Sequence, residues 1–356
     1  MRGIVYDGTA PAVRTDVEVR PPGPTDVAIR IVNAGVCHSD LSVLDGSIPF
    51  PTPLVMGHEG AGVVDAVGSE VTKLKVGDHV VLSTLKYCGQ CSACNTGFPT
   101  RCRRSFGVMS QPFTVGGEPA YNFAATSVFT DVTVVDQVQA VKVSKDIPLQ
   151  SACLIGCGVI TGAGAVLNTA DVTHGQTVAV FGVGGIGLNV IQAAKLCDAS
   201  RIIAVDTMAS KKDLALDFGA TDFVDASDGG AVEQIQQLVK GGVDWSFECV
   251  GHPAVVGDAV KALDWGGNCV IIGVPAPTAK MEVPITHLTH IDRGVRGCRY
   301  GGARPHHDIP LLVQLYLDGK LKLDELVSKT YPMESFAEVV EDMHAGRLAR
   351  GVLTYS

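Results

Sequence analysis

The chain has 356 residues, enough for two domains of ordinary size. Hydrophobic residues make up 46% of it and charged residues only 18%, so the composition excludes an intrinsically disordered protein. The net charge of −9, without a long basic run, argues against nucleic acid or an anionic membrane surface as a partner.

The amino-terminal residues predict a cytoplasmic protein, because Met1–Asp7 carries charges and lacks the apolar stretch of a secretory signal. The uncharged stretch 176–194 has a length that could suggest a membrane span. It contains several glycines together with Asn189 and Gln192, so we interpret it as a buried strand, turn and helix.

Short runs rich in β-branched residues, separated by Gly, Pro and Asp, occupy the first part of the chain. We predict strands at residues 4–6, 27–32, 62–67, 79–82 and 132–135. Strands this short indicate a twisted barrel or sandwich, with long loops that can carry functional residues.

The pattern changes near residue 155, where strands begin to alternate with helices. Strands are predicted at 177–181, 201–205, 223–224, 245–249 and 268–272, and helices at 187–196, 210–218, 231–239 and 253–262. This alternation is typical of βαβ units and predicts a parallel, doubly wound sheet. The chain ends with predicted helices at 309–317 and 335–345 and a strand at 351–355.

A glycine-rich turn follows the first strand of this second part and opens its first helix. At this spacing Gly182 allows a tight turn, Gly184 admits a pyrophosphate, and Gly187 lets the helix pack on the strand. Gly185 and Ile186 complete the turn, and the free N–H groups at the start of the helix can bind the phosphates. The motif predicts a dinucleotide site.

Asp206 ends the next predicted strand, nineteen residues after Gly187. An acidic residue at this place binds the ribose hydroxyls of a dinucleotide, and its charge repels the 2′-phosphate of NADP. The sequence therefore predicts NAD as the cofactor.

The chain has 11 cysteines, and four of them lie close together in one loop. Cys88, Cys91, Cys94 and Cys102 have the spacing of ligands to one tetrahedral zinc ion. In a reducing compartment such a cluster indicates a metal site rather than disulfides. Because four protein ligands leave no open position, we predict a structural zinc site.

Three other segments combine cysteine, histidine and acidic residues. Cys37-His38-Ser39-Asp40 follows the strand at 27–32, His58-Glu59 precedes the strand at 62–67, and Cys157 lies where the pattern changes. Spacing alone cannot join residues so far apart in the sequence, and a single buried cysteine is often a packing residue.

Together, these motifs resemble those of the zinc-dependent medium-chain alcohol dehydrogenase family over essentially the whole chain. The matching segments are GVCHSD at 35–40, GHEGAGVV at 57–64, the four-cysteine loop, IGCGVITG at 155–162, GVGGIG at 182–187 and Asp206. The resemblance implies an α/β protein with a GroES-like catalytic domain at 1–158, a Rossmann NAD-binding domain at 159–300 and a return segment of the catalytic domain at 301–356.

By this resemblance Cys37, His58 and Cys157 bind a catalytic zinc ion whose fourth position is open, so that the chain holds two zinc ions. Asp40 matches an acid that orients the ligand histidine, and Glu59 matches an acid able to approach the metal. The implied reaction is reversible hydride transfer from a primary alcohol to NAD, which gives the aldehyde.

The resemblance also implies a proton path. Ser39 matches the hydroxyl that takes the proton of the alcohol and passes it on through the nicotinamide ribose. Many members complete this relay with a histidine three residues later. Here that residue is Ser42, which leaves the exit of the proton open.

Further cofactor contacts follow from the resemblance. His38 and Arg350 match residues that contact the cofactor pyrophosphate, where cations pair with phosphate. Thr161 matches a residue packed beside the nicotinamide, and Lys211 matches a lysine near the adenosine ribose.

The substrate is less well defined. Thr84 and Ile48 lie where other members carry larger aromatic residues, so we expect medium-chain, allylic or aromatic primary alcohols. The alternative is oxidation of S-(hydroxymethyl)glutathione, for which one branch uses an arginine just beyond the fourth structural cysteine. Phe106 aligns with that arginine, while Arg103 and Arg104 lie nearby.

Members of the family are dimers or tetramers that associate through edge strands of the Rossmann domain. The corresponding segments here are Asn268–Val274 and Arg293–Tyr300. The segment between Cys102 and Phe129 resembles that of dimeric members, so we expect a homodimer, with a homotetramer as the alternative.

Overall fold

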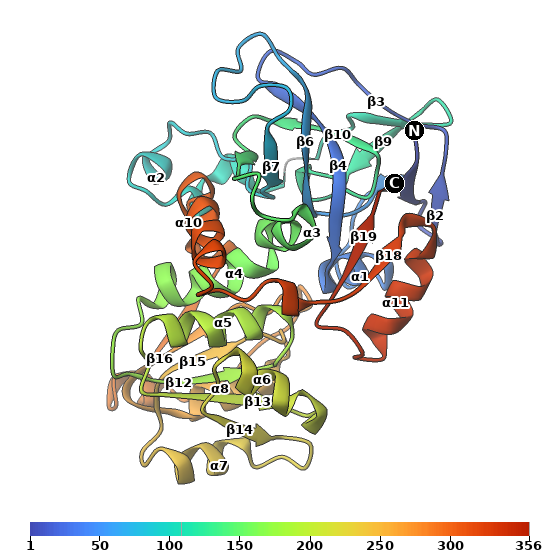
Figure 1. Ribbon diagram of the computed structural model, residues 1–356. Helices are drawn as coiled ribbons and strands as arrows, with labels where there is room; N and C mark the ends of the chain where they lie inside the picture. Colours follow the sequence, from blue (N-terminus) through green and yellow to red (C-terminus); the bar gives the residue numbers. More distant parts are fainter. Residues whose placement is uncertain (108, 356) are drawn as a thin grey trace. The chain divides into compact units, whose positions relative to one another are not determined.

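The computed structural model describes residues 1–107 and 109–355 and divides into two compact units. The first unit comprises Met1–Gly158 and Arg304–Ser356, and the second comprises Val159–Ala303. In Figure 1 the first unit is blue to green and red, because the end of the chain returns to it.

The second unit ends three residues beyond the expected boundary, and the reason is a close backbone contact. Gly301 has a φ of +66°, and a Cβ atom on it would lie 2.3 Å from the carbonyl oxygen of Ile160. The turn at residues 300–302 therefore packs tightly on helix α4 (Gly158–Gly164).

Two sheets form the first unit, as expected for a β-rich barrel or sandwich. One has the strand order β2-β1-β5-β9-β8-β3, and the other has the order β11-β7-β6-β4-β19-β18, with β10 paired to β4. The strands of the first sheet are β1 (Gly3–Tyr6), β2 (Pro11–Arg14), β3 (Val17–Val19), β5 (Leu54–Val55), β8 (Phe113–Val115) and β9 (Glu118–Asn122). Those of the second are β4 (Asp26–Val36), β6 (Glu59–Val67), β7 (His79–Leu82), β10 (Val132–Asp136), β11 (Ala140–Lys142), β18 (Val327–Pro332) and β19 (Arg350–Thr354).

Several connections between strands of the first unit contain helices. They are α1 (His38–Leu44), α2 (Ser92–Asn95), α3 (Leu149–Ala152), α10 (Pro305–Leu317) and α11 (Phe336–His344). Side chains of the return segment, such as Tyr331 and Phe336, share one buried core with Ile29 and Phe129. The carboxyl-terminal segment therefore completes the hydrophobic core of the first unit.

The second unit is a parallel sheet of six strands in the order β14-β13-β12-β15-β16-β17. The strands are β12 (Thr177–Phe181), β13 (Arg201–Asp206), β14 (Asp222–Asp225), β15 (Val243–Glu248), β16 (Leu263–Ile271) and β17 (Gly294–Gly297). In sequence order this is the arrangement 3-2-1-4-5-6 of the doubly wound dinucleotide-binding fold, which confirms the predicted fold class. Ligands of such sheets bind at the carboxyl ends of β12 and its neighbours, where the strand order reverses.

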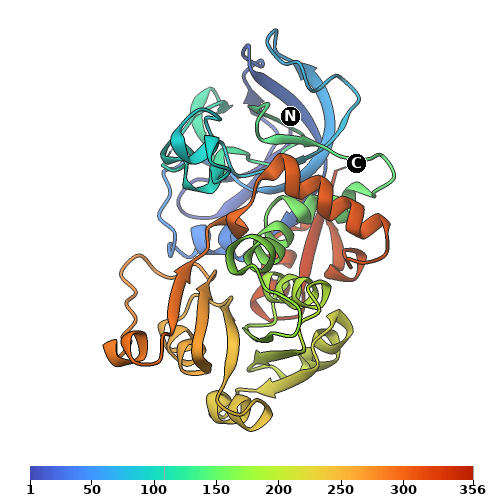
Figure 2. The same cartoon turned by 90° about the vertical axis from the view of Figure 1, so that its left-hand side faces the viewer.

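Helices cover both faces of this sheet. α5 (Gly185–Leu196) packs with α6 (Lys212–Phe218), and α7 (Ala231–Leu238) packs with α8 (Pro253–Lys261). A short helix, α9 (Ile285–Thr289), precedes β17. Figure 2 shows the strands of this unit side by side in yellow to orange.

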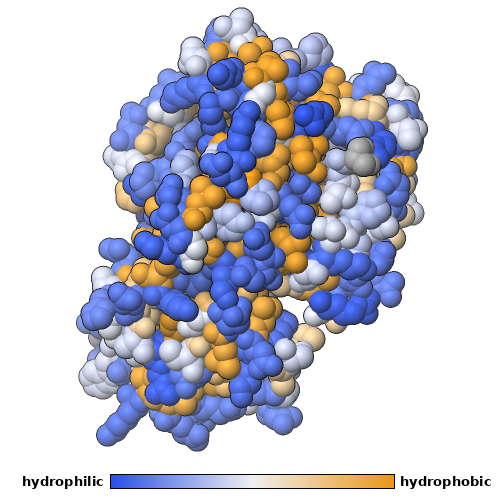
Figure 3. All heavy atoms as spheres, in the orientation of Figure 1, coloured by the Kyte–Doolittle hydropathy of each residue, from blue (hydrophilic) through white to orange (hydrophobic). Residues whose placement is uncertain are grey.

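No single helix in the described residues is long and apolar enough to cross a membrane, although the bent pair Leu149–Gly156 and Gly158–Ala170 has the required length and composition. Most residues of that pair are buried within the protein. On the face shown in Figure 3, hydrophobic residues lie in patches among hydrophilic ones.

Candidate functional site

Four buried or half-buried residues from distant parts of the sequence meet in the first unit. Cys37 follows β4, His58 and Glu59 lie at the start of β6, and Cys157 lies between a short helical turn and α4. Their ligand atoms all lie within 4.8 Å of one another. The register explains this meeting, because Gly35 of β4 pairs with Glu59 of β6 and so brings Cys37 beside His58.

Asp40 fixes the orientation of the His58 ring. One carboxylate oxygen, Oδ1, lies 3.1 Å from His58 Nδ1, and the other accepts the backbone N–H of Cys37 at 2.9 Å. Burial lowers the pKa of His58, but Asp40 raises it well above the ordinary value. His58 Nε2 is buried and has no hydrogen-bond partner in the part of the chain that the structure describes.

Each of the two thiols of the cluster shifts the pKa of the other. A hydrogen bond between Cys37 and Cys157 holds the pKa of Cys37 well below its ordinary value and raises the pKa of Cys157 well above it. Two thiols and a buried ring nitrogen that has no hydrogen-bond partner among the described residues are a donor set that zinc prefers. The residues therefore fit a zinc ion held by Cys37, His58 and Cys157.

Glu59 and Arg350 add opposite charges to this cluster. Burial raises the pKa of Glu59 to about 7. Its Oε1 accepts the Gly158 N–H at 3.2 Å and lies 3.6 Å from Nη2 of Arg350, which is itself buried. β19 pairs with the end of β4, and this pairing places Arg350 beside the cluster. The predicted contact of Arg350 with a pyrophosphate stays a prediction.

Helix α1 carries the residues expected to move the proton. Ser39 is half-buried, and its Oγ lies 3.9 Å from Cys37 Sγ. Ser42 is also half-buried and lies three residues later on the same helix, so the two hydroxyls share one helix face. His38 is exposed at the start of α1.

An aromatic cluster that the sequence did not reveal lies against His58. The Phe123 ring packs edge-on against the imidazole with a centroid distance of 5.3 Å, and Phe50 packs edge-on against Phe123 at 5.5 Å. Ile48 belongs to the same apolar cluster, whereas Thr84, after β7, is half-buried and outside it. Phe50 and Phe123 are far apart in sequence and have no motif, so no local signal could have identified them.

The four-cysteine loop forms a second potential metal site. Its sulfur atoms lie within 4.8 Å of one another, with 3.5 Å between Cys91 and Cys94 and 3.6 Å between Cys102 and Cys88. All four are free thiols. The backbone N–H of Gln90 lowers the pKa of Cys88 to about 6, and burial raises that of Cys94 to about 12. The loop fits one zinc ion with four sulfur ligands.

The glycine motif in the second unit has the geometry of a phosphate cradle. Gly182 has a φ of +94°, and a Cβ atom on Gly187 would lie 1.9 Å from the Gly182 carbonyl oxygen. Gly184, the N-cap of α5, has open space where a side chain would be. Gly185 and Ile186 form the first turn of α5, which leaves their N–H groups free of intrahelical acceptors. These residues fit a dinucleotide pyrophosphate.

Asp206 and Lys211 lie beside this turn. Asp206 Oδ2 accepts the Val183 N–H at 2.7 Å and lies 2.9 Å from Lys211 Nζ. Thr161 is buried on α4, whose Gly162 lies against the start of α5. The structure thus pairs the Lys211 ammonium group with the Asp206 carboxylate, and the expected contacts of both residues with an adenosine ribose stay predictions.

Glu248 is a further residue of this unit that the sequence analysis missed. It ends β15, its Oε1 accepts the N–H groups of Val250 and Gly251 at 2.8 and 2.7 Å, and burial raises its pKa. A Cβ atom on Gly182 would lie 2.7 Å from Val250. The carboxyl group therefore fixes the turn that packs against the phosphate cradle. The signal available in the sequence was an acidic residue near the end of the predicted apolar strand at 245–249.

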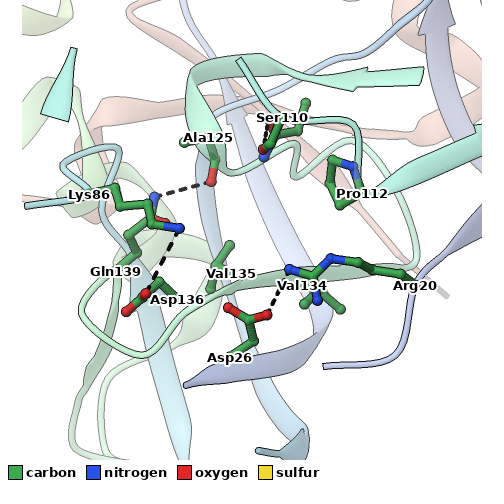
Figure 4. Close-up of a pocket in the computed structure, with 11 residues that line it drawn as sticks. Arg20, Asp26, Lys86, Ser110, Pro112, Ala125, Val134, Val135, Asp136 and Gln139 are labelled. Atoms are coloured by element: carbon green, nitrogen blue, oxygen red, sulfur yellow. Dashed lines mark hydrogen bonds and ion pairs between the residues drawn. The ribbon is translucent and has the colours of Figure 1, made fainter. Parts of the chain in front are cut away.

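A small hollow elsewhere in the first unit carries no comparable site. Its volume is about 30 Å³, and its cations are paired, with 2.7 Å between Arg20 and Asp26 and 3.9 Å between Lys86 and Asp136 (Figure 4). A hollow of this size holds little more than a water molecule.

Comparisons with known proteins agree with this geometry. The profile described as "Alcohol dehydrogenase GroES-like domain" matches residues 23–145, and that described as "Zinc-binding dehydrogenase" matches residues 185–318. S-(hydroxymethyl)glutathione dehydrogenase of Saccharomyces cerevisiae is 39% identical over 367 residues, which cover 98% of this chain and 95% of the yeast protein.

Two solved structures are similar over the full chain. The alcohol dehydrogenase zinc-binding domain protein from Burkholderia ambifaria is 36% identical with a TM-score of 0.95, covering 100% of this chain and 98% of that one. Benzyl alcohol dehydrogenase from Acinetobacter calcoaceticus is 33% identical with a TM-score of 0.94, covering 100% and 99%.

Proposed function

Because this chain belongs to the zinc-dependent medium-chain alcohol dehydrogenase family, we propose that it reversibly oxidises a primary alcohol to an aldehyde with NAD as the hydride acceptor. The observation that carries the proposal is the buried donor set of Cys37, His58 and Cys157, with His58 Nε2 unpartnered among the described residues. When bound, zinc would polarise the hydroxyl group of the alcohol, and NAD would accept the hydride.

The residues around this site orient the proposed zinc ligands and transfer a proton. Asp40 fixes His58 through Nδ1 and leaves Nε2 for the metal. Ser39 Oγ accepts the proton of the alcohol while it gives up its own hydroxyl proton, and that proton leaves through water, because Ser42 has no ring nitrogen to take it. Arg350 supplies positive charge beside Glu59, within the same buried cluster.

In the second unit the glycine turn binds the pyrophosphate, and Asp206 binds the adenosine ribose. A carboxylate at this place disfavours a 2′-phosphate, which supports NAD over NADP. Lys211 holds the Asp206 carboxylate at 2.9 Å and lies near the same ribose. As the family resemblance implies, Thr161 packs beside the nicotinamide, and His38 and Arg350 contact the pyrophosphate, where cations pair with phosphate.

The substrate is an aromatic, allylic or medium-chain primary alcohol. Phe123 and Phe50 form an aromatic wall beside His58. By the family resemblance, Ile48 and Thr84 stand where bulkier residues would narrow the substrate site. Aromatic rings pack well edge-on against one another, which favours a benzylic substrate. The similarity to a benzyl alcohol dehydrogenase supports this assignment.

Oxidation of S-(hydroxymethyl)glutathione is the second candidate, because the yeast relative carries that name. Fewer features of the structure support this second reaction. Phe106, at the position of the expected arginine, is 78% exposed. Arg103 and Arg104 line a hollow whose lining includes no residue of the catalytic cluster.

We also propose a homodimer, with a homotetramer as the alternative. β17 is an edge strand of the parallel sheet, and exposed apolar residues such as Val274 and Ile285 precede it. Exposed edges and apolar patches of this kind are typical association surfaces.

NADH formation with benzyl alcohol, compared with formaldehyde plus glutathione, tests the proposed reaction. We expect turnover with benzyl alcohol and NAD, and little with NADP. Turnover only with the glutathione adduct would replace the first candidate by the second, and turnover with neither would contradict both.

A further inference from the structure

Positive charge is concentrated around the four-cysteine loop. Residues 79–117 include no Asp or Glu, although the whole chain has 37 acidic residues against 28 basic ones. The same stretch carries Lys86, Arg101, Arg103 and Arg104. The loop is therefore a positive region on a protein of net negative charge.

The three arginines line one hollow of about 500 Å³ that contains no acidic residue. The lining residues are Cys91, Ser92, Ala93, Thr96, Phe98, Arg101, Cys102, Arg103 and Arg104. Arg101, Arg103 and Arg104 are exposed, and none of them forms an ion pair with any described residue. The hollow in Figure 4 differs in this respect, since its Arg20 and Lys86 each face an aspartate.

Balancing the charge of the cysteine thiolates does not account for these arginines. None of the three side chains donates a hydrogen bond to a cysteine sulfur; the sulfur atoms contact one another and backbone N–H groups such as that of Gln90. The proposed reaction does not use them either, because the hollow includes no residue of the catalytic cluster.

Exposed apolar side chains accompany the arginines. The Arg101 guanidinium lies 4.2 Å from the centre of the Phe98 ring, which is 44% exposed. Phe106 and Met109, next along the chain, are 78% and 48% exposed. Arginine, aromatic residues and methionine are the types enriched at protein–protein interfaces. The combination favours a polypeptide partner over a small anion, which would need only the charges.

We propose that this surface binds an acidic segment of a partner protein. We call it the arginine surface, and it consists of Phe98, Arg101, Arg103, Arg104, Phe106 and Met109. Carboxylates of the partner pair with the guanidinium groups, which can bind them in bidentate fashion, and apolar side chains of the partner pack on the exposed rings. The four cysteines, whose sulfur atoms lie within 4.8 Å of one another, would tether the loop that carries the arginines when they hold a zinc ion.

Fluorescence anisotropy with a fluorescein-labelled peptide of repeating Glu-Glu-Leu tests the proposal on the full-length zinc-loaded protein. We expect saturable binding that R103E/R104E weakens by about tenfold or more and that salt also weakens. The matched control is K73E/K75E, which makes the same change of charge at two exposed lysines of the same unit and should bind nearly as the parent protein does.

Equal weakening by both charge reversals would mean that only net charge matters and would overturn the proposal. Displacement of the peptide by millimolar inorganic phosphate or glutathione would also overturn it in favour of a small-anion site. Zinc content is measured for each variant, and R103Q/R104Q replaces the charge reversal if that variant loses zinc. Activity with benzyl alcohol should be unchanged throughout.

Discussion

The Asp40 carboxylate lies 3.1 Å from His58 Nδ1 and is completely buried with it. A buried carboxylate in this position selects the tautomer in which Nδ1 carries the proton and Nε2 is free to bind a metal. The same carboxylate accepts the Cys37 N–H, so one side chain organises two of the three proposed ligands.

The first prediction follows from this pair. Asp40→Ala should lower zinc affinity at the catalytic site by about 10–100-fold, the usual effect of losing the partner of a ligand histidine. The measurement is zinc retained during titration with a competing chelator. Asp45→Ala, an exposed acid at the end of the same helix, is the control and should behave as the parent. Equal retention by both variants would contradict the role given to Asp40.

Glu248→Ala should weaken dinucleotide binding by releasing the turn at Val250 and Gly251. It removes two hydrogen bonds, each contributing about 1 kcal/mol to the free energy of unfolding. Thermal unfolding and quenching of protein fluorescence by NADH measure the two effects. Glu248→Gln retains an acceptor oxygen and should restore most of both, whereas failure of that rescue would show that the negative charge itself is needed.

Phe50→Ala should change substrate preference without disturbing the metal site. Phe50 contacts Phe123 rather than His58, so its loss opens the aromatic wall. We expect kcat/KM for benzyl alcohol to fall by about tenfold and that for ethanol to change by less than about twofold. Phe98→Ala, on the arginine surface, is the matched control. An equal fall in kcat/KM for benzyl alcohol and ethanol in Phe50→Ala would show that the aromatic wall does not determine substrate preference.

Asp222 and Arg201 predict an acid-dependent contribution to stability. The Arg201 guanidinium forms two hydrogen bonds of 2.8 Å to Asp222 and lowers the pKa of that carboxyl. A pKa lowered in the folded state contributes stability above the unfolded-state value, and this contribution disappears as the pH falls through the folded-state pKa. Urea unfolding should therefore find Asp222→Asn less stable than the parent at neutral pH, by about 1 kcal/mol or less because Arg201 is partly exposed. If the same difference in stability between Asp222→Asn and the parent persists at a pH below the folded-state pKa of Asp222, the ion pair is not its cause.

Local sequence patterns predicted most elements of both units. The strands at 27–32 and 201–205 and the helices at 187–196 and 309–317 all lie within observed elements, because their hydrophobic period matches their structure. Strands such as β5, with two residues, have no local signal, since they form only by pairing with β1 and β9.

The residues of the candidate sites also differ in whether a local sequence pattern could identify them. Cys88, Cys91, Cys94 and Cys102 are close in sequence, so their spacing alone indicates a metal site. The approach of Cys157 to Cys37 depends on tertiary packing, such as that of Leu154 against Gly35, and needed the family resemblance. Phe123 and Glu248 contribute through packing and burial, which the sequence does not display.

Zinc content and NADH formation, measured together for the parent protein and Cys157→Ala, test whether Cys37, His58 and Cys157 hold a catalytic zinc ion. We expect about two zinc ions per chain and turnover of benzyl alcohol for the parent, and about one zinc ion with no turnover for the variant. A Cys157→Ala variant that keeps both zinc ions and full turnover would show that Cys37, His58 and Cys157 are not the catalytic metal site.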